Sequence, residues 1–273
     1  MQRLFAALLL GSTLVLPALT PALADTTITV AGSTALLPLA KDAAGAYQQA
    51  HPDVKISVSG GGSGTGMNQV AAKAVDIGNS DILPPANLKD SLHDNRVCVV
   101  GFSVILHPGL KVKNLTKAQI QEIFTGKVTN WNQVGGADQK IVIVNRPRSS
   151  GTRAVFVKAL MGGKAVNESG ITEDATGTVV SVVKQTPGAV SYASWSGTKN
   201  SGLTEVSIDG VEPDDANVIN GKYAFWSYEH MYTNGPPTGE ISRFIAFLQT
   251  RSDLIKKNAF IKMGDMKVKE TDR

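Results

Sequence analysis

The chain has 273 residues, a length that fits one large domain or two modest ones. Its 42% hydrophobic and 18% charged residues can supply an apolar core, and they exclude disordered, collagenous and coiled-coil proteins. The formal net charge of +4 comes from basic residues scattered along the chain, and only 6% of the residues are aromatic, so the composition does not indicate a nucleic-acid partner.

The first 24 residues are typical of a secretory signal peptide. Arg3 supplies a positive charge, an apolar run follows at residues 4–16, and the Ala-Leu-Ala at residues 22–24 matches a cleavage signal. The apolar run is shorter than the roughly 20 residues that a membrane span requires, so a retained anchor is the less favoured alternative. Residues 1–24 are therefore predicted to be a signal peptide, cleaved after Ala24, of an exported protein.

After the leader, segments with strand periodicity alternate with segments of helical periodicity. The predicted strands are 27–31, 54–59, 75–78, 97–106, 141–145 and 188–194, and the predicted helices are 35–50, 67–74, 116–124, 152–161, 238–249 and 252–260. Thr116 is expected to cap the helix that it opens. Strands that alternate with helices indicate an α/β fold with parallel sheets.

Cys98 is the only cysteine in the chain. A single thiol cannot form an intramolecular disulfide, and it makes a multi-thiolate metal site implausible. Because Cys98 lies within the apolar run of residues 97–100, we expect it to be a small buried hydrophobic side chain.

Three short turns share one pattern, in which a strand ends, small residues that include serine follow, and a helix begins. They are Ala-Gly-Ser-Thr at 31–34, Gly-Gly-Gly-Ser-Gly-Thr-Gly at 60–66, and Ser-Ser-Gly-Thr at 149–152. Each helix start presents unpaired backbone N–H groups, the hydroxyls add donors, and glycine lets an anion approach the backbone. One such turn is more often an ordinary helix cap, but three in one chain indicate an oxyanion site.

These turns do not match the phosphate loops of nucleotide-binding proteins. Met67 follows the loop at 60–66 where a Walker A motif requires lysine. Thr65 stands where the dinucleotide motif requires its third glycine. The pattern therefore favours a site for a small anion.

Two charged residues that follow strands complete the predicted site. Arg146 comes directly after the strand at 141–145, where open α/β sheets bind ligands, and its guanidinium can bind an oxyanion through paired donors; the alternative is a surface salt bridge. Asp81 follows the strand at 75–78, and an ionised aspartate only accepts hydrogen bonds. Phosphate keeps at least one proton near neutral pH and sulfate keeps none, so Asp81 predicts selection of phosphate over sulfate.

The three turns, together with residues 75–81, Gln69 and residues 146–152, resemble the substrate-binding proteins of bacterial phosphate ABC transporters, the PstS family. The resemblance follows the family in order from residue 27 to about residue 152. It implies a type II periplasmic-binding-protein-like α/β fold, in which the chain crosses twice between two lobes that enclose a ligand cleft. The implied division places residues 25–105 and 223–273 in lobe I and residues 106–222 in lobe II.

The resemblance also implies the function and the site. The protein would bind inorganic phosphate and deliver it to the ABC transporter permease at the inner membrane, as a monomer with no cofactor, no metal and no catalytic residue. Carried over position by position, the phosphate-binding residues would be Thr34, Ala35, Ser63, Asp81, Arg146, Ser150, Gly151 and Thr152, with Ser33 beside them.

The chain departs from the family pattern just after Arg146. Longer family members carry an acidic residue in this stretch that pairs with the arginine, and shorter ones often have a glutamate nearby, whereas here the residues are Pro-Arg-Ser at 147–149. We therefore expect Arg146 to lack its usual orienting partner. Arg148 and Arg153 are expected to be exposed at the surface, and the alternative is that they make the cleft more positive. Ser191 stands where the family tends to have a second glycine.

No enzyme motif is assembled in the sequence. Residues 181–184 match Ser-x-x-Lys without the companion β-lactamase motifs, and the four histidines are isolated from one another. An enzyme is therefore not expected. Three alternatives stay open: a binding protein for another oxyanion such as sulfate or molybdate, a secreted phosphatase that reuses the same cradle, and a surface or matrix protein without transport.

Overall fold

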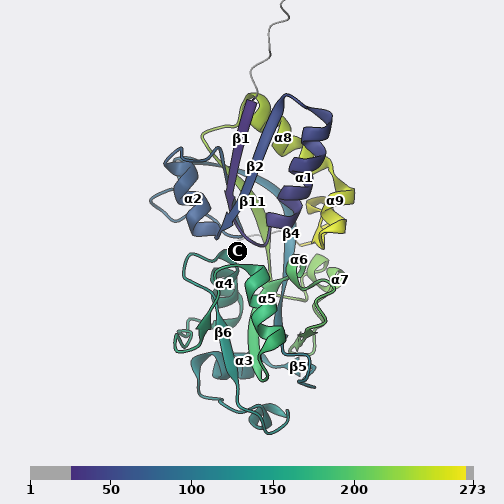
Figure 1. Cartoon of the computed structure of the whole chain (residues 1–273). Coiled ribbons are helices and arrows are strands. Elements are labelled where there is room, and N and C mark those ends of the chain that lie inside the picture. Colours follow the sequence, from purple (N-terminus) through teal and green to yellow (C-terminus); the bar gives the residue numbers. More distant parts are fainter. Residues whose placement is uncertain (1–25, 269–273) are drawn as a thin grey trace, which may run out of the picture.

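The computed structural model describes residues 26–268, so the predicted signal peptide and its cleavage site lie outside the described residues. The described chain forms two α/β lobes, one above the other in Figure 1, which meet around the long strand β4 (Leu92–Leu106). One sheet runs through both lobes in the order β2-β1-β3-β11-β4-β8-β6-β7, and β9 and β12 also pair with β4. The predicted two-lobed α/β architecture is confirmed.

Lobe I is the upper lobe of Figure 1 and contains the start of the described chain, whereas the last described residues reach lobe II, where Lys267 N–H donates to the carbonyl of Ile219 at 3.0 Å. Besides the first part of β4, its elements are β1 (Thr26–Gly32), α1 (Leu37–Ala50), β2 (Val54–Gly61), α2 (Ser63–Ala71), β3 (Ile77–Ser80), β11 (Trp226–Asn234), α8 (Gly239–Thr250), α9 (Ser252–Lys257), β12 (Phe260–Ile261) and the 3₁₀-helix Met263–Asp265.

Lobe II is the lower lobe and contains the middle of the chain. Besides the end of β4, its elements are β5 (Asn114–Leu115), α3 (Lys117–Thr125), the 3₁₀-helix Trp131–Val134, β6 (Val142–Asn145), α4 (Gly151–Phe156), the π-helix Val157–Met161, β7 (Ile171–Thr172), α5 (Thr176–Gln185), β8 (Ala189–Ser194), α6 (Trp195–Thr198), β9 (Thr204–Glu205), β10 (Ser207–Ile208) and α7 (Asp215–Ile219).

The sheet is mixed, so the prediction of parallel sheets is wrong at its centre. β1 pairs in parallel with β2 and β3, but β11 is antiparallel to both β3 and β4, and β4 is antiparallel to β8. Strand β11 was not predicted from the sequence. Eight of its nine residues are buried, polar ones included, so it lacks the alternation of polar and apolar residues that marks a half-exposed strand.

The chain crosses between the lobes at two adjacent places. β4 pairs with β11 up to Gly101 and with β8 from Phe102 onward, so the first crossing lies within this strand. The second crossing precedes β11, where the carbonyl of Phe225 accepts a hydrogen bond from the N–H of Phe102 at 3.0 Å. The rings of Phe102 and Phe225 also stack, with centroids 5.2 Å apart. The two crossings therefore form one connected hinge region.

Every predicted strand and helix corresponds to an observed element, but several boundaries differ. Residues 60–66, expected to be a loop, are divided between the end of β2 and the start of α2. The helix expected at 152–161 changes from α-helix to π-helix at Val157, and the helix expected at 252–260 ends at Lys257 before β12. Thr116 caps α3 as predicted, because its hydroxyl accepts a hydrogen bond from Gln119 N–H at 3.1 Å.

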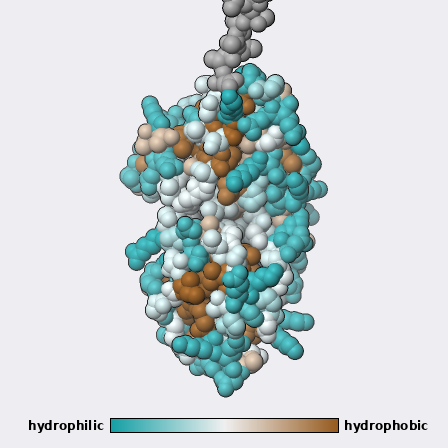
Figure 2. All heavy atoms as spheres, in the orientation of Figure 1, coloured by the Kyte–Doolittle hydropathy of each residue, from teal (hydrophilic) through white to brown (hydrophobic). Residues whose placement is uncertain are grey.

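The apolar core continues from one lobe into the other. A stack of aromatic rings, including Phe156 and Tyr192 with centroids 4.1 Å apart, lies in lobe II and reaches Phe225 at the hinge. Cys98 is fully buried as expected. Figure 2 shows mostly hydrophilic residues on the visible face, with apolar patches on both lobes. None of the helices within residues 26–268 is long and apolar enough to span a membrane.

Candidate anion-binding site

Lobe I brings polar side chains to the junction from the ends of three neighbouring strands. Ser33 and Thr34 follow β1, Ser63 begins α2 after β2, and Asp81 follows β3. These three strands are parallel, so their carboxyl ends meet at one edge of the sheet. All four side chains are buried, and the most exposed of them, Thr34, retains only 7% of its accessible surface.

The hydroxyls of Ser33 and Ser63 organise the backbone at this edge. Ser33 Oγ accepts hydrogen bonds from the N–H groups of Ala35 and Leu36, both at 3.1 Å. Ser63 Oγ accepts one from the N–H of Asp81 at 2.9 Å, which joins the start of α2 to the end of β3. The N–H of Ala35, expected to bind the anion, is thus engaged by Ser33 in this structure.

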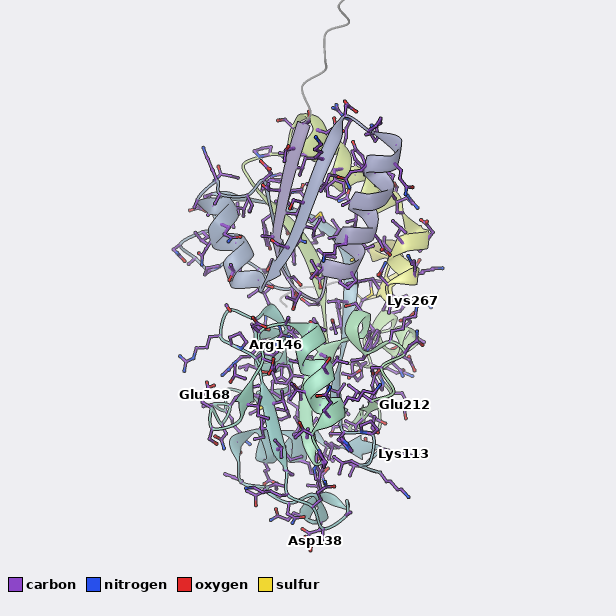
Figure 3. The ribbon with its side chains drawn as sticks, in the orientation of Figure 1. Lys113, Asp138, Arg146, Glu168, Glu212 and Lys267 are labelled. Atoms are coloured by element: carbon purple, nitrogen blue, oxygen red, sulfur yellow. The ribbon has the colours of Figure 1, made fainter. Side chains whose placement is uncertain are left out.

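Lobe II brings Arg146 and the start of α4 to the same place. Arg146 follows β6, and Ser150 caps α4 by accepting a hydrogen bond from Arg153 N–H at 3.2 Å. Thr152 Oγ1 donates to Asp81 Oδ2 across the junction at 2.9 Å. Arg146, Ser150 and Thr152 are each at most 2% exposed, and Figure 3 shows Arg146 at the end of lobe II that faces lobe I.

Gly151 lies where the two lobes touch. A Cβ atom at this position would be 2.1 Å from Ser63 Oγ and 2.9 Å from the Cβ of Asp81. Beside this contact, the backbones of the two lobes are hydrogen-bonded, with Gly64 N–H donating to the carbonyl of Ser149 at 3.0 Å. The predicted site residues of the two lobes are therefore in direct contact, and Gly151 is needed for that approach.

The main chain and a second arginine orient Arg146. Its Nη2 donates to the carbonyl of Asp174 at 3.0 Å and to Thr34 Oγ1 at 3.1 Å. The carbonyl of Arg146 accepts a 2.6 Å hydrogen bond from Arg153 Nη1, and Arg153 also pairs with Glu168 at 2.5 Å. The absence of an acidic neighbour in the sequence therefore does not leave Arg146 without an orienting partner.

Arg148 and Arg153, both expected at the surface, differ from each other. The side chain of Arg148 is 88% exposed, which confirms the expectation for that residue. Arg153 is only 8% exposed, so the expectation for it is wrong. Its guanidinium is buried because it connects the end of β6 to Glu168, a long-range pairing that the sequence does not reveal.

Thr176 is a buried site neighbour that the sequence analysis missed. Its N–H donates to Thr34 Oγ1 at 3.2 Å, and the hydroxyls of the two threonines are 3.1 Å apart. Thr176 is 3% exposed and begins α5. The available signal was the Asp-Ala-Thr-Gly-Thr at residues 174–178, which repeats the pattern of small and hydroxyl residues before a helix.

Several polar atoms at the junction have no hydrogen-bond partner within the described residues. Among them are Nε and Nη1 of Arg146 and Oδ1 of Asp81. Buried polar groups are ordinarily paired, so two donors of a cation and one acceptor of a carboxylate can receive a bound molecule. A small anion that carries one proton matches this set of donors and acceptor.

Burial shifts the charges of both groups. It lowers the pKa of Arg146, and the neighbouring Asp81 partly offsets that change. It raises the pKa of Asp81, against hydrogen bonds from Ser33 and Thr152 and the charge of Arg146. Within residues 26–268, no group of three His, Cys, Asp or Glu side chains is placed to hold a metal ion.

Comparison with known proteins agrees with this geometry. Residues 18–252 match the family model of a PBP superfamily domain. The chain is 42% identical to "Phosphate-binding protein PstS" of Bacillus subtilis (strain 168), over 90% of this chain and 83% of the relative.

Two solved structures resemble the whole described fold. One, from Clostridium perfringens, is described as a phosphate ABC transporter substrate-binding protein with bound phosphate; its TM-score is 0.83 at 30% identity, with coverage of 87% of this chain and all of the other. The second is an ABC-type phosphate transport receptor from Vibrio cholerae, with a TM-score of 0.71, 26% identity and the same coverage. The predicted periplasmic-binding-protein-like fold is confirmed, and the chain belongs to the PstS family of the PBP superfamily.

Proposed function

We propose that this protein binds inorganic phosphate between its lobes in the periplasm and delivers it to the permease of a phosphate ABC transporter. The observation that carries the proposal is the set of buried, unpartnered atoms at the junction, two donors on Arg146 and one acceptor on Asp81. The names of the similar proteins support the same ligand and the same transport role.

In the proposed site, a cation, several hydroxyls and one hydrogen-bond acceptor each contact the phosphate. Nε and Nη1 of Arg146 each donate a charge-assisted hydrogen bond to a phosphate oxygen. Asp81 accepts the remaining phosphate proton. The other contacts come from hydroxyl and backbone groups of Ser33, Thr34, Ala35, Ser63, Ser150, Gly151 and Thr152.

Capture and release would follow from rotation of the lobes about the two crossings. We assign residues 25–105 and 223–273 to lobe I and residues 106–222 to lobe II, a division supported by the change of β4 partner between Gly101 and Phe102. Opening would break direct bonds between lobes, such as that from Ser196 Oγ to the carbonyl of Ala35 at 2.7 Å. No covalent step is required, so the proposed role is that of a monomeric, exported binding protein and not of an enzyme.

Titration calorimetry with phosphate and then sulfate tests the ligand. We expect phosphate to bind at least about 100-fold more tightly, because sulfate has no proton for Asp81 and would leave a buried acceptor opposite an anion. Equal affinities would contradict the selectivity, and absence of phosphate binding would contradict the function. Hydrolysis of an aryl phosphate that scales with protein and is lost in Arg146→Ala would favour the phosphatase alternative.

A further inference from the structure

Behind Asp81 lies a second buried acid, Glu229, which neither the sequence analysis nor the anion site uses. It is in the middle of β11 and has no accessible surface. Neither of its carboxyl oxygens receives a hydrogen bond from a donor within the described residues. A buried ionised carboxylate without donors is costly, so the position requires a chemical explanation.

The pairing of β11 with β3 brings Glu229 near Asp81. The last pair of this antiparallel ladder is His230 opposite Ser80, and these two residues are the chain neighbours of Glu229 and Asp81. Ser227, two residues before Glu229 on the same face of the strand, donates to the carbonyl of Asp81 at 2.7 Å. The carboxyl group of Asp81 is close enough to raise the pKa of Glu229, through its charge and through a hydrogen bond between the two side chains.

Two carboxylates in contact inside a protein cannot both be ionised, because each disfavours the charge of the other. Among the described residues, none that shifts the pKa of Glu229 is a cation. Cys98 is opposite Glu229 on β4, and its thiol is neutral because burial raises its pKa. The positive charge of Arg146 acts on Asp81. His230, the next residue on β11, pairs with Asp94 at 2.7 Å.

Between the two acids, Glu229 is the one that holds the proton. Burial and the proximity of Asp81 raise the pKa of Glu229 well above its usual range. Burial raises the pKa of Asp81 too, but Thr152 Oγ1 donates to its carboxylate and Arg146 is a nearby positive charge, both of which favour the ionised form. Glu229 has neither kind of support.

We propose that Glu229 is a positioning residue for the anion site, a neutral carboxylic acid that donates its hydrogen bond to the carboxylate of Asp81. A carboxylate has about four acceptor positions, so Asp81 can accept from Glu229 and Thr152 and still accept the proton of a bound anion. The bond fixes the orientation of the Asp81 carboxylate and keeps Asp81 an acceptor. The idea rests on the proposed function, because its readout is selectivity between phosphate and sulfate.

Two variants test whether Glu229 acts as a hydrogen-bond donor or only fills space. Glu229→Gln keeps the shape and an N–H donor toward Asp81, and Glu229→Met keeps the approximate volume without a donor. We expect Glu229→Gln to bind phosphate within about threefold of the parent, and Glu229→Met to lose about tenfold or more in phosphate affinity with a smaller change for sulfate. Calorimetry from pH 5 to pH 9 measures both affinities.

Cys98→Ala provides the matched control, because it removes a buried group opposite Glu229 without touching the carboxyl pair. It should lower thermal stability and leave the ratio of phosphate to sulfate affinity unchanged. Infrared spectroscopy gives a readout independent of any ligand: the parent should show the carbonyl band of a protonated carboxylic acid at neutral pH, and Glu229→Gln should lack it.

The outcomes distinguish this inference from the proposed function. If the parent does not bind phosphate, the proposed function fails, and the infrared band still decides whether Glu229 is neutral. If the parent binds phosphate but folded Glu229→Met keeps the parent's selectivity at every pH, the positioning role is wrong. If Glu229→Gln loses as much affinity as Glu229→Met, a neutral hydrogen-bond donor at this position does not support the site and the proposed role is refuted.

Discussion

The two lobes contribute opposite chemistry to one site. Lobe II presents Arg146. Its guanidinium donates to the carbonyl of Asp174, and the carbonyl of Arg146 accepts a hydrogen bond from Arg153. Lobe I presents Asp81, an acid with a second acid, Glu229, behind it. An arginine whose guanidinium is oriented by hydrogen-bond acceptors can bind any oxyanion. An ionised acid accepts a hydrogen bond only from an anion that carries a proton, so it distinguishes phosphate from sulfate. We therefore expect affinity to depend mainly on lobe II and selectivity mainly on lobe I.

The largest expected effect comes from removing the cation of lobe II. Arg146→Ala should weaken phosphate and sulfate binding together, by about 3–5 kcal/mol, since it deletes the buried charge that faces Asp81. Calorimetry measures both affinities, and circular dichroism checks the fold. Arg148→Ala, which removes an 88% exposed arginine from the same turn, should bind both anions like the parent. Loss of phosphate affinity alone would show that lobe II also discriminates.

A smaller effect, limited to selectivity, is expected from the acid of lobe I. Asp81→Asn replaces an acceptor-only group by one that can also donate, so it should bind sulfate better and phosphate less well. The preference for phosphate should narrow by about 1.5–3 kcal/mol, the range for a hydrogen bond to a charged group. Competition between the two anions measures it. An unchanged preference would refute the assignment of selectivity to lobe I.

The support of Arg146 within lobe II should matter less than Arg146 itself. Arg153→Ala removes the 2.6 Å hydrogen bond to the carbonyl of Arg146, and with it the pairing to Glu168. We expect phosphate affinity to fall by about 2 kcal/mol, with an equal loss for sulfate. Glu168→Gln, which weakens the pairing but leaves Arg153 in place, should lose less. Equal losses of phosphate affinity in Arg153→Ala and Glu168→Gln would show that Glu168, and not the hydrogen bond from Arg153 to the Arg146 carbonyl, supports binding.

The stability of the protein should depend on pH through Glu229 of lobe I. The pKa of Glu229 is raised in the folded protein, so its proton is released more readily from the unfolded chain. Its contribution to stability is therefore complete below the unfolded pKa of about 4.5 and is lost as the pH rises toward the folded pKa.

Between the unfolded and the folded pKa of Glu229, the unfolding free energy of the parent should fall relative to that of Glu229→Gln by up to about 1.4 kcal/mol per pH unit. Urea unfolding of both proteins across the pH range measures the difference. A parent and variant with parallel pH profiles would mean that Glu229 titrates in the folded protein as it does in the unfolded chain.

Much of the site could be predicted because it is encoded locally. Ser33, Ser63 and Ser150 lie in turns whose small residues and following helices are visible in a short window, and Arg146 and Asp81 directly follow strand patterns. The structure brings all of these residues to one junction. Their individual roles toward phosphate stay predictions, and the Ala35 N–H would have to leave Ser33 Oγ in order to bind the anion.

The residues that could not be predicted act through long-range partners. Arg153 looked like a surface residue because its acceptors, the Arg146 carbonyl and Glu168, are defined only once the chain folds. Thr176 lies 142 residues from Thr34, its neighbour across the junction, and Glu229 lies 148 residues from Asp81, its neighbour within lobe I. The antiparallel β11, which carries Glu229, gave no periodic signal because both its faces are buried.

The sequence by itself determined the α/β class, the three small-residue turns and the two charged residues that follow strands, because helix starts, strand periodicity and glycine positions are local properties of the chain. Only the tertiary structure decided which side chains share a buried environment. β11 pairs with β3 and β4, and that pairing sets one acid against another. The protonation state of Glu229 depends on that contact and on the exclusion of water, neither of which a linear sequence contains.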